Sequence, residues 1–193
     1  MKFFVSTPLL PLSSDETFRG VGVYALYYLG SHPLYEALGK RNKLKCVQPI
    51  YVGKAVPAGW RTARTNEGDS ASELFRRISE HARSLHQVEG LPASDFRYRF
   101  VIMEGIEADL IGSLEASMIR KYMPVWNTVI DGFGNHDPGK GRYNQAKSEW
   151  DALHPGRPWA ERLTGATPSL ERIKKELTAA MRRYRLRKKT TAS

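Results

Sequence analysis

Three segments of the chain have the apolar pattern of β-strands. Residues 21 to 29 alternate between two faces, of which one carries Gly22, Tyr24, Leu26 and Tyr28. Residues 46 to 52, after a polar connection at 30 to 45, form a second strand that Pro49 shortens. Residues 96 to 103 place apolar side chains on one face and two arginines on the other, which predicts a half-buried third strand.

Helices are predicted between and after these strands. Ser70 and Glu73 have capping-box spacing, and the apolar stripe that follows them consists of Leu74, Phe75, Ile78, Ala82 and Leu85. A second helix is predicted from about residue 108 to residue 122, because Pro124 ends a similar pattern. The order strand, strand, helix, strand, helix indicates a mixed α/β domain.

The end of the chain has a different composition. A Gly-rich loop covers residues 131 to 142, and a segment that contains Trp and Pro continues to about residue 168. A final amphipathic helix runs into the sequence RRYRLRKK, which is almost entirely basic. We therefore expect a basic, helical C-terminal extension.

Helical geometry singles out polar residues on both internal helices. Arg77 and His81 are one turn apart at the edge of the apolar stripe, whereas Arg76 projects to the far side. Glu115 falls inside the stripe of the second helix, where an unpaired carboxylate would destabilise the fold by several kcal/mol. Glu115 is therefore expected either to pair with an arginine or to bind a metal ion at the edge of a cleft.

The charge of the chain points to its class of partner. The 193 residues, enough for one domain with a real core, include 30 Lys and Arg against 20 Asp and Glu, which gives a net charge of +10. This excess favours a polyanion such as nucleic acid, although a soluble basic protein of another kind has the same composition.

Cysteine usage and hydropathy predict a cytoplasmic protein without a membrane span. The one cysteine, Cys46, excludes an intrachain disulfide and a cysteine-based zinc cluster. Pro8 and Pro11 interrupt the apolar start of the chain before a signal-peptide core forms. No stretch approaches the ~20 apolar residues of a membrane helix.

Other catalytic patterns match poorly. The histidines lack the spacing of a zinc site, and the Gly-rich loop lacks the Ser or Thr of a nucleotide-binding loop. A single carboxylate such as Glu115 instead suits Mg²⁺, because this ion keeps several of its waters.

Six features in order resemble the GIY-YIG nucleases. Two of them are GVY at 22 to 24 and YVGKA at 51 to 55, and the other four are Arg77, His81, Glu115 and Asn127. The resemblance covers about residues 18 to 128. It implies the α/β (α+β) core of that family, a small, mainly antiparallel three-stranded sheet flanked by helices.

Departures from the common pattern narrow the resemblance. His81 stands where DNA-repair members have tyrosine, and the two signature motifs are unusually far apart. These features and the Gly-rich tail are more similar to the type II restriction endonucleases of the superfamily, in particular the group that cuts CCGCGG. Val23, in place of the isoleucine of the first motif, is a minor change on the face opposite Tyr24.

The resemblance implies roles in phosphodiester hydrolysis. Tyr24 would be the general base, with its pKa lowered by Lys54, Arg77 and a bound metal ion. Arg77 would clamp the phosphate, and Glu115 would hold Mg²⁺, for which Mn²⁺ can substitute.

Three further residues would support this chemistry. Tyr51 would hydrogen-bond the phosphate or a metal-bound water, and His81 would orient Tyr24 or share its proton. Asn127 would position backbone or a group next to the metal ligands.

DNA contacts are predicted on both sides of the site. An insert at 54 to 69 and the C-terminal extension supply the candidates Lys54, Trp60, Arg61, Arg64, Arg142 and Lys147. Alternatively, the insert and the basic end of the chain are loops that only face solvent, since such loops have the same composition.

The sequence thus predicts an N-terminal arm (1 to 17), a nuclease core (18 to 128) and an extension (129 to 193). The expected protein is a homodimer on double-stranded DNA, with any cognate methyltransferase acting separately. A structure-directed or homing-type nicking nuclease and a noncatalytic nucleic-acid-binding module remain as alternatives.

Overall fold

An antiparallel sheet of four strands lies at the centre of the described chain. The computed structural model describes residues 7 to 13, 17 to 57, 60 and 72 to 186. The strands follow the order β1–β4–β2–β3, and their bounds are Leu10–Pro11 for β1, Gly22–Tyr28 for β2, Tyr51–Ala55 for β3 and Phe96–Ile102 for β4. The predicted α/β class and the antiparallel pairing are confirmed, and in the described residues β1 is added to the three expected strands.

The added strand belongs to the predicted N-terminal arm. Leu10 lies opposite Tyr98 of β4, and Pro11 lies opposite Arg97. Proline has no amide proton to donate and is tolerated at a sheet edge, which is where β1 lies. The described end of the arm is therefore part of the sheet.

The second predicted strand begins later than its sequence indicates. Residues 46 to 52 are expected to be extended, but β3 starts at Tyr51. The connection before it contains a helix, α2 (Glu36–Asn42), whose last residue donates to the carbonyl of Gln48 at 2.9 Å and accepts from its amide at 3.1 Å. The backbone before Pro49 is therefore held by α2 rather than by the sheet.

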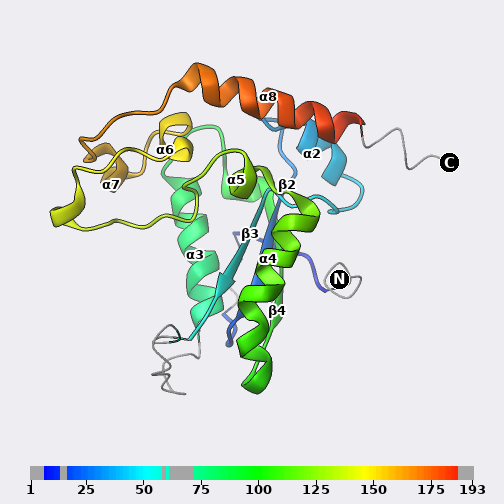
Figure 1. Ribbon diagram of the computed structural model, residues 1–193. Coiled ribbons are helices and arrows are strands. Elements are labelled where there is room, and N and C mark those ends of the chain that lie inside the picture. Colours follow the sequence, from blue (N-terminus) through cyan, green and yellow to red (C-terminus); the bar gives the residue numbers. More distant parts are fainter. Residues whose placement is uncertain (1–6, 14–16, 58–59, 61–71, 187–193) are drawn as a thin grey trace.

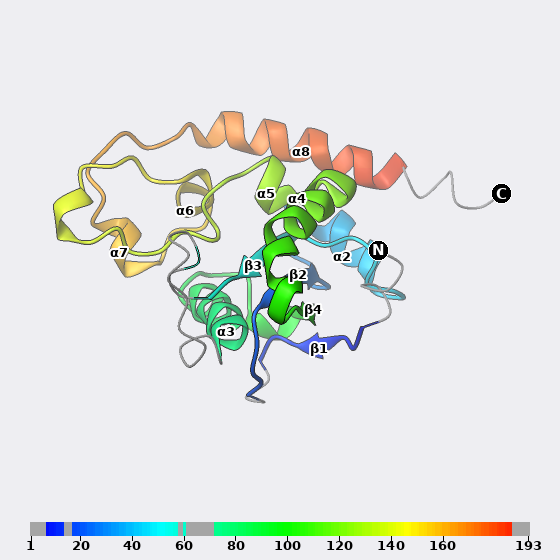
Figure 2. The ribbon, with the colours of Figure 1, turned by 60° about the horizontal axis from the view of Figure 1, so that its bottom comes forward.

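Helices cover both faces of the sheet. α3 (Glu73–His86) packs on the face that carries Tyr24, and α4 (Ile111–Tyr122) packs on the face that carries Val23. Figure 2 shows these helices on different sides of the strands. Tyr24 and Val23 are both fully buried, which confirms the alternation predicted for β2.

Both internal helices start later than predicted. α3 begins after Ser72, whose side chain makes no capping hydrogen bond, and Ser70 of the expected capping box lies outside the described residues. α4 is preceded by a 3-10 helix, Gly105–Leu110. The apolar stripe of α3 is nevertheless confirmed, since its buried residues include Leu74, Ile78 and Leu85.

The third strand is partly buried, as predicted, but the expectation that both of its arginines lie on the solvent side is wrong for Arg99. Arg99 of β4 is only 8% exposed and lies 5.4 Å from the centre of the Tyr27 ring. Its guanidinium donates to the carbonyls of Cys46 at 2.8 Å and Thr7 at 3.1 Å. The segments before β3 and β1 therefore cover the face that the alternation assigns to solvent.

The C-terminal part of the chain folds back onto the core. α8 (Leu170–Leu186) runs along α2 and α6 (Glu149–Leu153), as Figure 1 shows. Ile173 and Leu177 of α8 join the same apolar cluster as Leu26. The remaining elements are α5 (Val125–Thr128), α7 (Pro158–Glu161) and the 3-10 turns Ala93–Asp95 and Lys140–Arg142. None of the helices in the described ranges is long and apolar enough to cross a membrane.

The buried histidine of this region predicts how stability depends on pH. His154 Nε2 lies 2.6 Å from the Tyr35 hydroxyl, and burial lowers the pKa of His154 from 6.5 to about 3. Below pH 6.5 the unfolded chain therefore binds a proton that the folded chain does not, so the fold loses stability as the pH falls. At about pH 5 this one group accounts for a loss of about 2 kcal/mol.

We expect His154→Gln to reduce the pH dependence of the free energy of unfolding by about 2 kcal/mol between about pH 7.5 and about pH 5. Urea denaturation at the two pH values measures it, with the exposed His86→Gln as the matched control. Equal pH dependence in wild type and His154→Gln would contradict the assignment.

Candidate active site

The predicted base lies at the centre of the sheet. Tyr24 of β2 is fully buried, and its hydroxyl is 2.6 Å from Nε2 of His81 on α3. Opposite Tyr24 in the sheet register is Gly53 of β3, where a β-carbon would lie 2.5 Å from the Tyr24 hydroxyl. The glycine of the second motif therefore makes room for the tyrosine of the first.

The second motif tyrosine joins this pair from the neighbouring strand. The Tyr51 ring centre is 5.1 Å from that of His81 and 6.3 Å from that of Tyr24. Three of the predicted site residues, from β2, β3 and α3, thus form one aromatic cluster.

Burial keeps this cluster uncharged. Desolvation raises the pKa of Tyr24 well above 10.0, and among the charged groups near it Arg77 lowers the pKa. Desolvation also raises the pKa of Tyr51 to about 12. The pKa of His81 is held well below 6.5 by burial and then by Arg77. A neutral His81 can accept the hydrogen of the Tyr24 hydroxyl at Nε2.

The expected depression of the Tyr24 pKa is therefore wrong for the protein alone. Arg77 acts in the expected direction, but desolvation outweighs it. Lys54, the other cation expected to help, is engaged elsewhere, because its Nζ is 2.6 Å from Glu115 Oε2.

The predicted phosphate and metal residues share one cavity. Its volume is about 400 Å³, and its lining includes Tyr51, Lys54, Arg77 and Glu115. Arg77 lies at the edge of the core and Arg76 is exposed, as the helical geometry predicts. Glu115 has the cationic partner that its position requires, but this partner is a lysine of β3 and not an arginine.

Asn127 supports the site through the backbone. Its side-chain oxygen accepts from the amide of Val52, and its side-chain nitrogen donates to the carbonyl of Val52, both at 2.8 Å. β3 is an edge strand, so the side-chain amide of Asn127 makes the two hydrogen bonds that a further strand would make to Val52. Asn127 thereby fixes the strand that carries Tyr51 and Lys54.

The sequence indicated the Gly-rich loop at 131 to 142 but not that this loop covers the aromatic cluster. Phe133 stacks on His81, with ring centres 4.6 Å apart and planes at 17°, and packs edge-on against Tyr51. Gly134 follows it, and a β-carbon there would lie 2.5 Å from the Tyr51 hydroxyl. His136 then contacts Arg77 through Nε2. The sequence signal for this contact was the aromatic Phe133 between two glycines, but the contact with α3 depends on the tertiary fold.

A buried arginine fixes this loop. Arg157 binds Asp151 through two nitrogens at 2.6 and 2.7 Å. It also donates to the carbonyls of Gly132 at 2.8 Å, Phe133 at 3.1 Å and Asn135 at 3.2 Å. Every side-chain nitrogen of Arg157 is thus bound, and the loop carbonyls are its acceptors.

The predicted DNA-contacting residues lie in several places. Lys54 is in the cavity of the site, and Trp60 lies near Gly112 of α4. Arg142 and Lys147 line a separate cavity of about 640 Å³ in the C-terminal part. Arg61 and Arg64 lie outside the described residues.

The residues fit a divalent ion that needs few protein ligands. The described residues contain no group of three or more His, Cys, Asp and Glu that could surround a metal. Two carboxylates line the cavity with Arg77, namely Glu115 and Glu73, and Glu73 is paired with Arg76 at 2.6 Å. Mg²⁺ commonly binds through one or two carboxylates together with water and phosphate oxygens.

An antiparallel sheet with two neighbouring tyrosines, flanked by one helix with an arginine and another with a glutamate, is the arrangement of a GIY-YIG nuclease. The family model described as the Eco29kI GIY-YIG domain matches residues 16–181, and the chain belongs to this type II restriction endonuclease family. The match continues well past residue 128, where the predicted core ends, and includes the loop with His136 and the buried Arg157. No curated protein matches the chain.

The Asn127 contact gives a test of how the site is supported. Asn127→Leu removes both the acceptor of the Val52 amide and the donor to its carbonyl, so we expect a loss of about 2 kcal/mol in the free energy of unfolding. We also expect faster hydrogen exchange at the Val52 amide, because this amide loses its acceptor. Denaturation and exchange measurements check this, with the exposed Asn144→Leu as control, and unchanged exchange at Val52 would refute the supporting role.

Proposed function

We propose that the chain is a restriction endonuclease that hydrolyses phosphodiester bonds in double-stranded DNA with the aid of one divalent metal ion. The observation that carries the proposal is the single cavity in which Arg77 and Glu115 meet beside the Tyr24–His81 pair. A GC-rich palindrome, with CCGCGG as the best candidate, is proposed from the resemblance of the motifs.

Tyr24 is the proposed general base, with His81 as its proton acceptor. A phenol whose pKa is raised cannot carry a stable negative charge at neutral pH. The 2.6 Å contact allows Tyr24 to take the proton of a water while its own proton passes to His81 Nε2. The negative phosphate that enters the cavity would make His81 a stronger proton acceptor.

Arg77 and Lys54 are the proposed phosphate ligands. In the protein alone Arg77 contacts His136 and Glu80, and Lys54 is paired with Glu115. DNA would offer both cations a phosphate, for which the arginine fork has two matching donors. Lys54 would then leave the carboxylate of Glu115 free.

Glu115 is the proposed metal ligand, and Tyr51 is proposed to bind the phosphate or a water of the metal. Mg²⁺, or Mn²⁺ in its place, would stabilise the negative charge of the leaving 3′ oxygen. Asn127 acts in this scheme by fixing β3.

The proposed assembly is a homodimer on DNA. One core has one base and one metal carboxylate, whereas a palindrome presents two equivalent strands. The N-terminal arm or the part after residue 128 is the proposed contact. DNA contacts are proposed for Lys54, Trp60, Arg61, Arg64, Arg142 and Lys147, and a cognate methyltransferase would act separately.

Plasmid digestion tests the metal residue. With Mg²⁺ we expect discrete fragments from the wild type and no cutting by Glu115→Gln, which keeps the side-chain shape but removes the anion. DNA binding measured without metal should be retained by the variant. The exposed Glu107→Gln serves as control and should cut normally.

Other results of the digestion would contradict the proposal. Nicked circles would indicate a structure-directed or homing-type nuclease, and bound but uncut DNA would indicate a binding module. Normal cleavage by Glu115→Gln, or cleavage by the wild type in excess EDTA, would exclude Glu115 and the metal from the reaction.

Removal of one hydroxyl tests the base. We expect Tyr24→Phe to lower the single-turnover cleavage rate at least about 100-fold while the fold and DNA affinity are kept. Tyr27→Phe on the opposite face of the same strand is the control, because Tyr27 is equally buried but belongs to the α4 side. Activity of Tyr24→Phe within about tenfold of wild type, or ~1.4 kcal/mol of barrier, would show that Tyr24 is not the base.

A further inference from the structure

The second cavity lies directly beside the proposed active site. It has a volume of about 640 Å³, and its lining includes Gly134, His136 and Arg142. His136 also contacts Arg77, and the Gly134 backbone lies against the Tyr51 hydroxyl. The loop that carries Gly134 and His136 thus lines the second cavity and contacts two residues, Tyr51 and Arg77, that line the first.

Most charges around this cavity are neutralised within the protein. Lys147 pairs with Glu161 at 2.6 Å, Arg172 pairs with Glu149, and Asp151 is bound by Arg157. Two charged lining residues have no ion pair in the described part of the chain. Asp131 accepts from the backbone amide of Glu149 at 3.1 Å, whereas Arg142 is exposed and its guanidinium has no acidic partner. An uncompensated cation at the rim of a cavity favours an anionic ligand.

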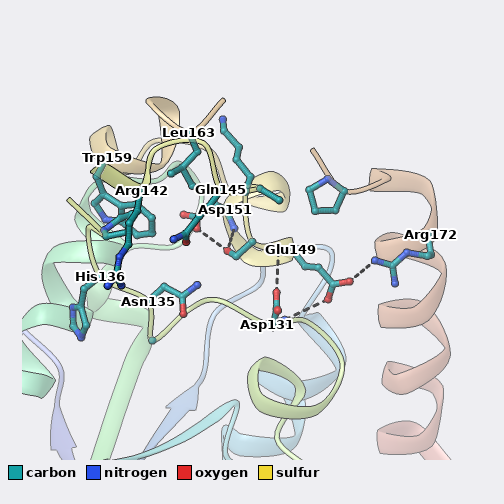
Figure 3. Close-up of a pocket in the computed structure, with 16 residues that line it drawn as sticks. Asp131, Asn135, His136, Arg142, Gln145, Glu149, Asp151, Trp159, Leu163 and Arg172 are labelled. Atoms are coloured by element: carbon teal, nitrogen blue, oxygen red, sulfur yellow. Dashed lines mark hydrogen bonds and ion pairs between the residues drawn. The ribbon is translucent and has the colours of Figure 1, made fainter. Parts of the chain in front are cut away.

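The loop between His136 and Arg142 is braced from within. The Asp137 carboxylate accepts from the Gly139 amide at 2.8 Å, from the Tyr143 hydroxyl at 3.1 Å and from Arg162 at 3.0 Å. The only acidic side chain in this loop is therefore occupied. Figure 3 shows His136 and Arg142 on the same side of the cavity.

From this arrangement we infer that His136 and Arg142 form a subsite for a DNA phosphate adjacent to the scissile one. The inference rests on the proposed function, in which Arg77 binds the scissile phosphate, and it assigns Arg142 a particular phosphate. A strand held at Arg77 carries further phosphates past the residues that flank it, and His136 is in contact with Arg77. Arg142 supplies a fork of donors for the phosphate oxygens.

The protonation of His136 gives this subsite a pH dependence. Burial and Arg77 lower the pKa of His136 in the free protein, and Arg76 and Arg157 act in the same direction. Glu80, whose Oε2 is 3.7 Å from His136 Nδ1, raises it. A phosphate bound here would favour the protonated ring, so DNA binding takes up a proton at His136.

The salt dependence of DNA binding tests the subsite without cleavage. Fluorescence anisotropy of a labelled duplex, measured in EDTA over a range of salt concentrations, counts the released counterions. We expect Arg142→Gln to reduce the slope of log K against log salt by about 0.9. We expect His136→Gln to reduce it at about pH 6 and much less at about pH 8. Lys175→Gln on the exposed side of α8 is the control and should leave the slope unchanged.

Neutral methylphosphonates then locate the contact. Replacing the phosphate next to the cleaved bond should weaken wild-type binding but should have little effect on the Arg142→Gln, His136→Gln double variant. The subsite would be excluded if both single variants had the salt slope of the wild type. It would also be excluded if the methylphosphonate weakened DNA binding equally in the wild type and the double variant. Cleavage by the wild type together with such a result would leave the proposed function intact. A protein with the expected slopes that cuts no DNA would contradict the proposed function instead.

Discussion

The buried guanidinium of Arg157 is the interaction on which the site depends most. Its charge is compensated by Asp151, and its remaining donors bind loop carbonyls from Gly132 to Asn135. Removing one partner of such a pair leaves an unsatisfied buried charge, which typically costs about 3–5 kcal/mol. Because this loop carries Phe133 onto His81 and His136 onto Arg77, the C-terminal part of the chain is a component of the site. The family match through residue 181 agrees with this.

In the protein without DNA or metal, the ionisable groups of the site are either neutral or paired with each other. Tyr24 and His81 are both neutral, because burial raises the pKa of the one and lowers that of the other. Lys54 and Glu115 neutralise each other at 2.6 Å. In the proposed mechanism each of these states changes when a phosphate and a divalent ion enter, so the substrate and the ion supply the charges that the reaction needs.

The sequence predicted the features that depend on local periodicity. The faces of β2, the position of Arg77 relative to Arg76 and the need of Glu115 for a cation all follow from strand and helix geometry. Features set by distant contacts were not predictable. The late start of β3 depends on α2, the burial of Arg99 depends on two coil segments, and the placement of Phe133 depends on Arg157. Lys54, in place of an arginine, is the partner of Glu115 because the pairing of β2 with β3 brings it there.

In the proposed mechanism Glu115 becomes a metal ligand when Lys54 moves to the DNA. A crystal structure of the Tyr24→Phe variant with a duplex and Mn²⁺ tests this, because anomalous scattering locates the ion directly. We expect an anomalous peak bound to the Glu115 carboxylate, with Lys54 Nζ moved from Oε2 to a phosphate and Arg77 on the scissile phosphate. A peak bound elsewhere, with the Lys54–Glu115 pair still intact in the presence of DNA, would contradict it.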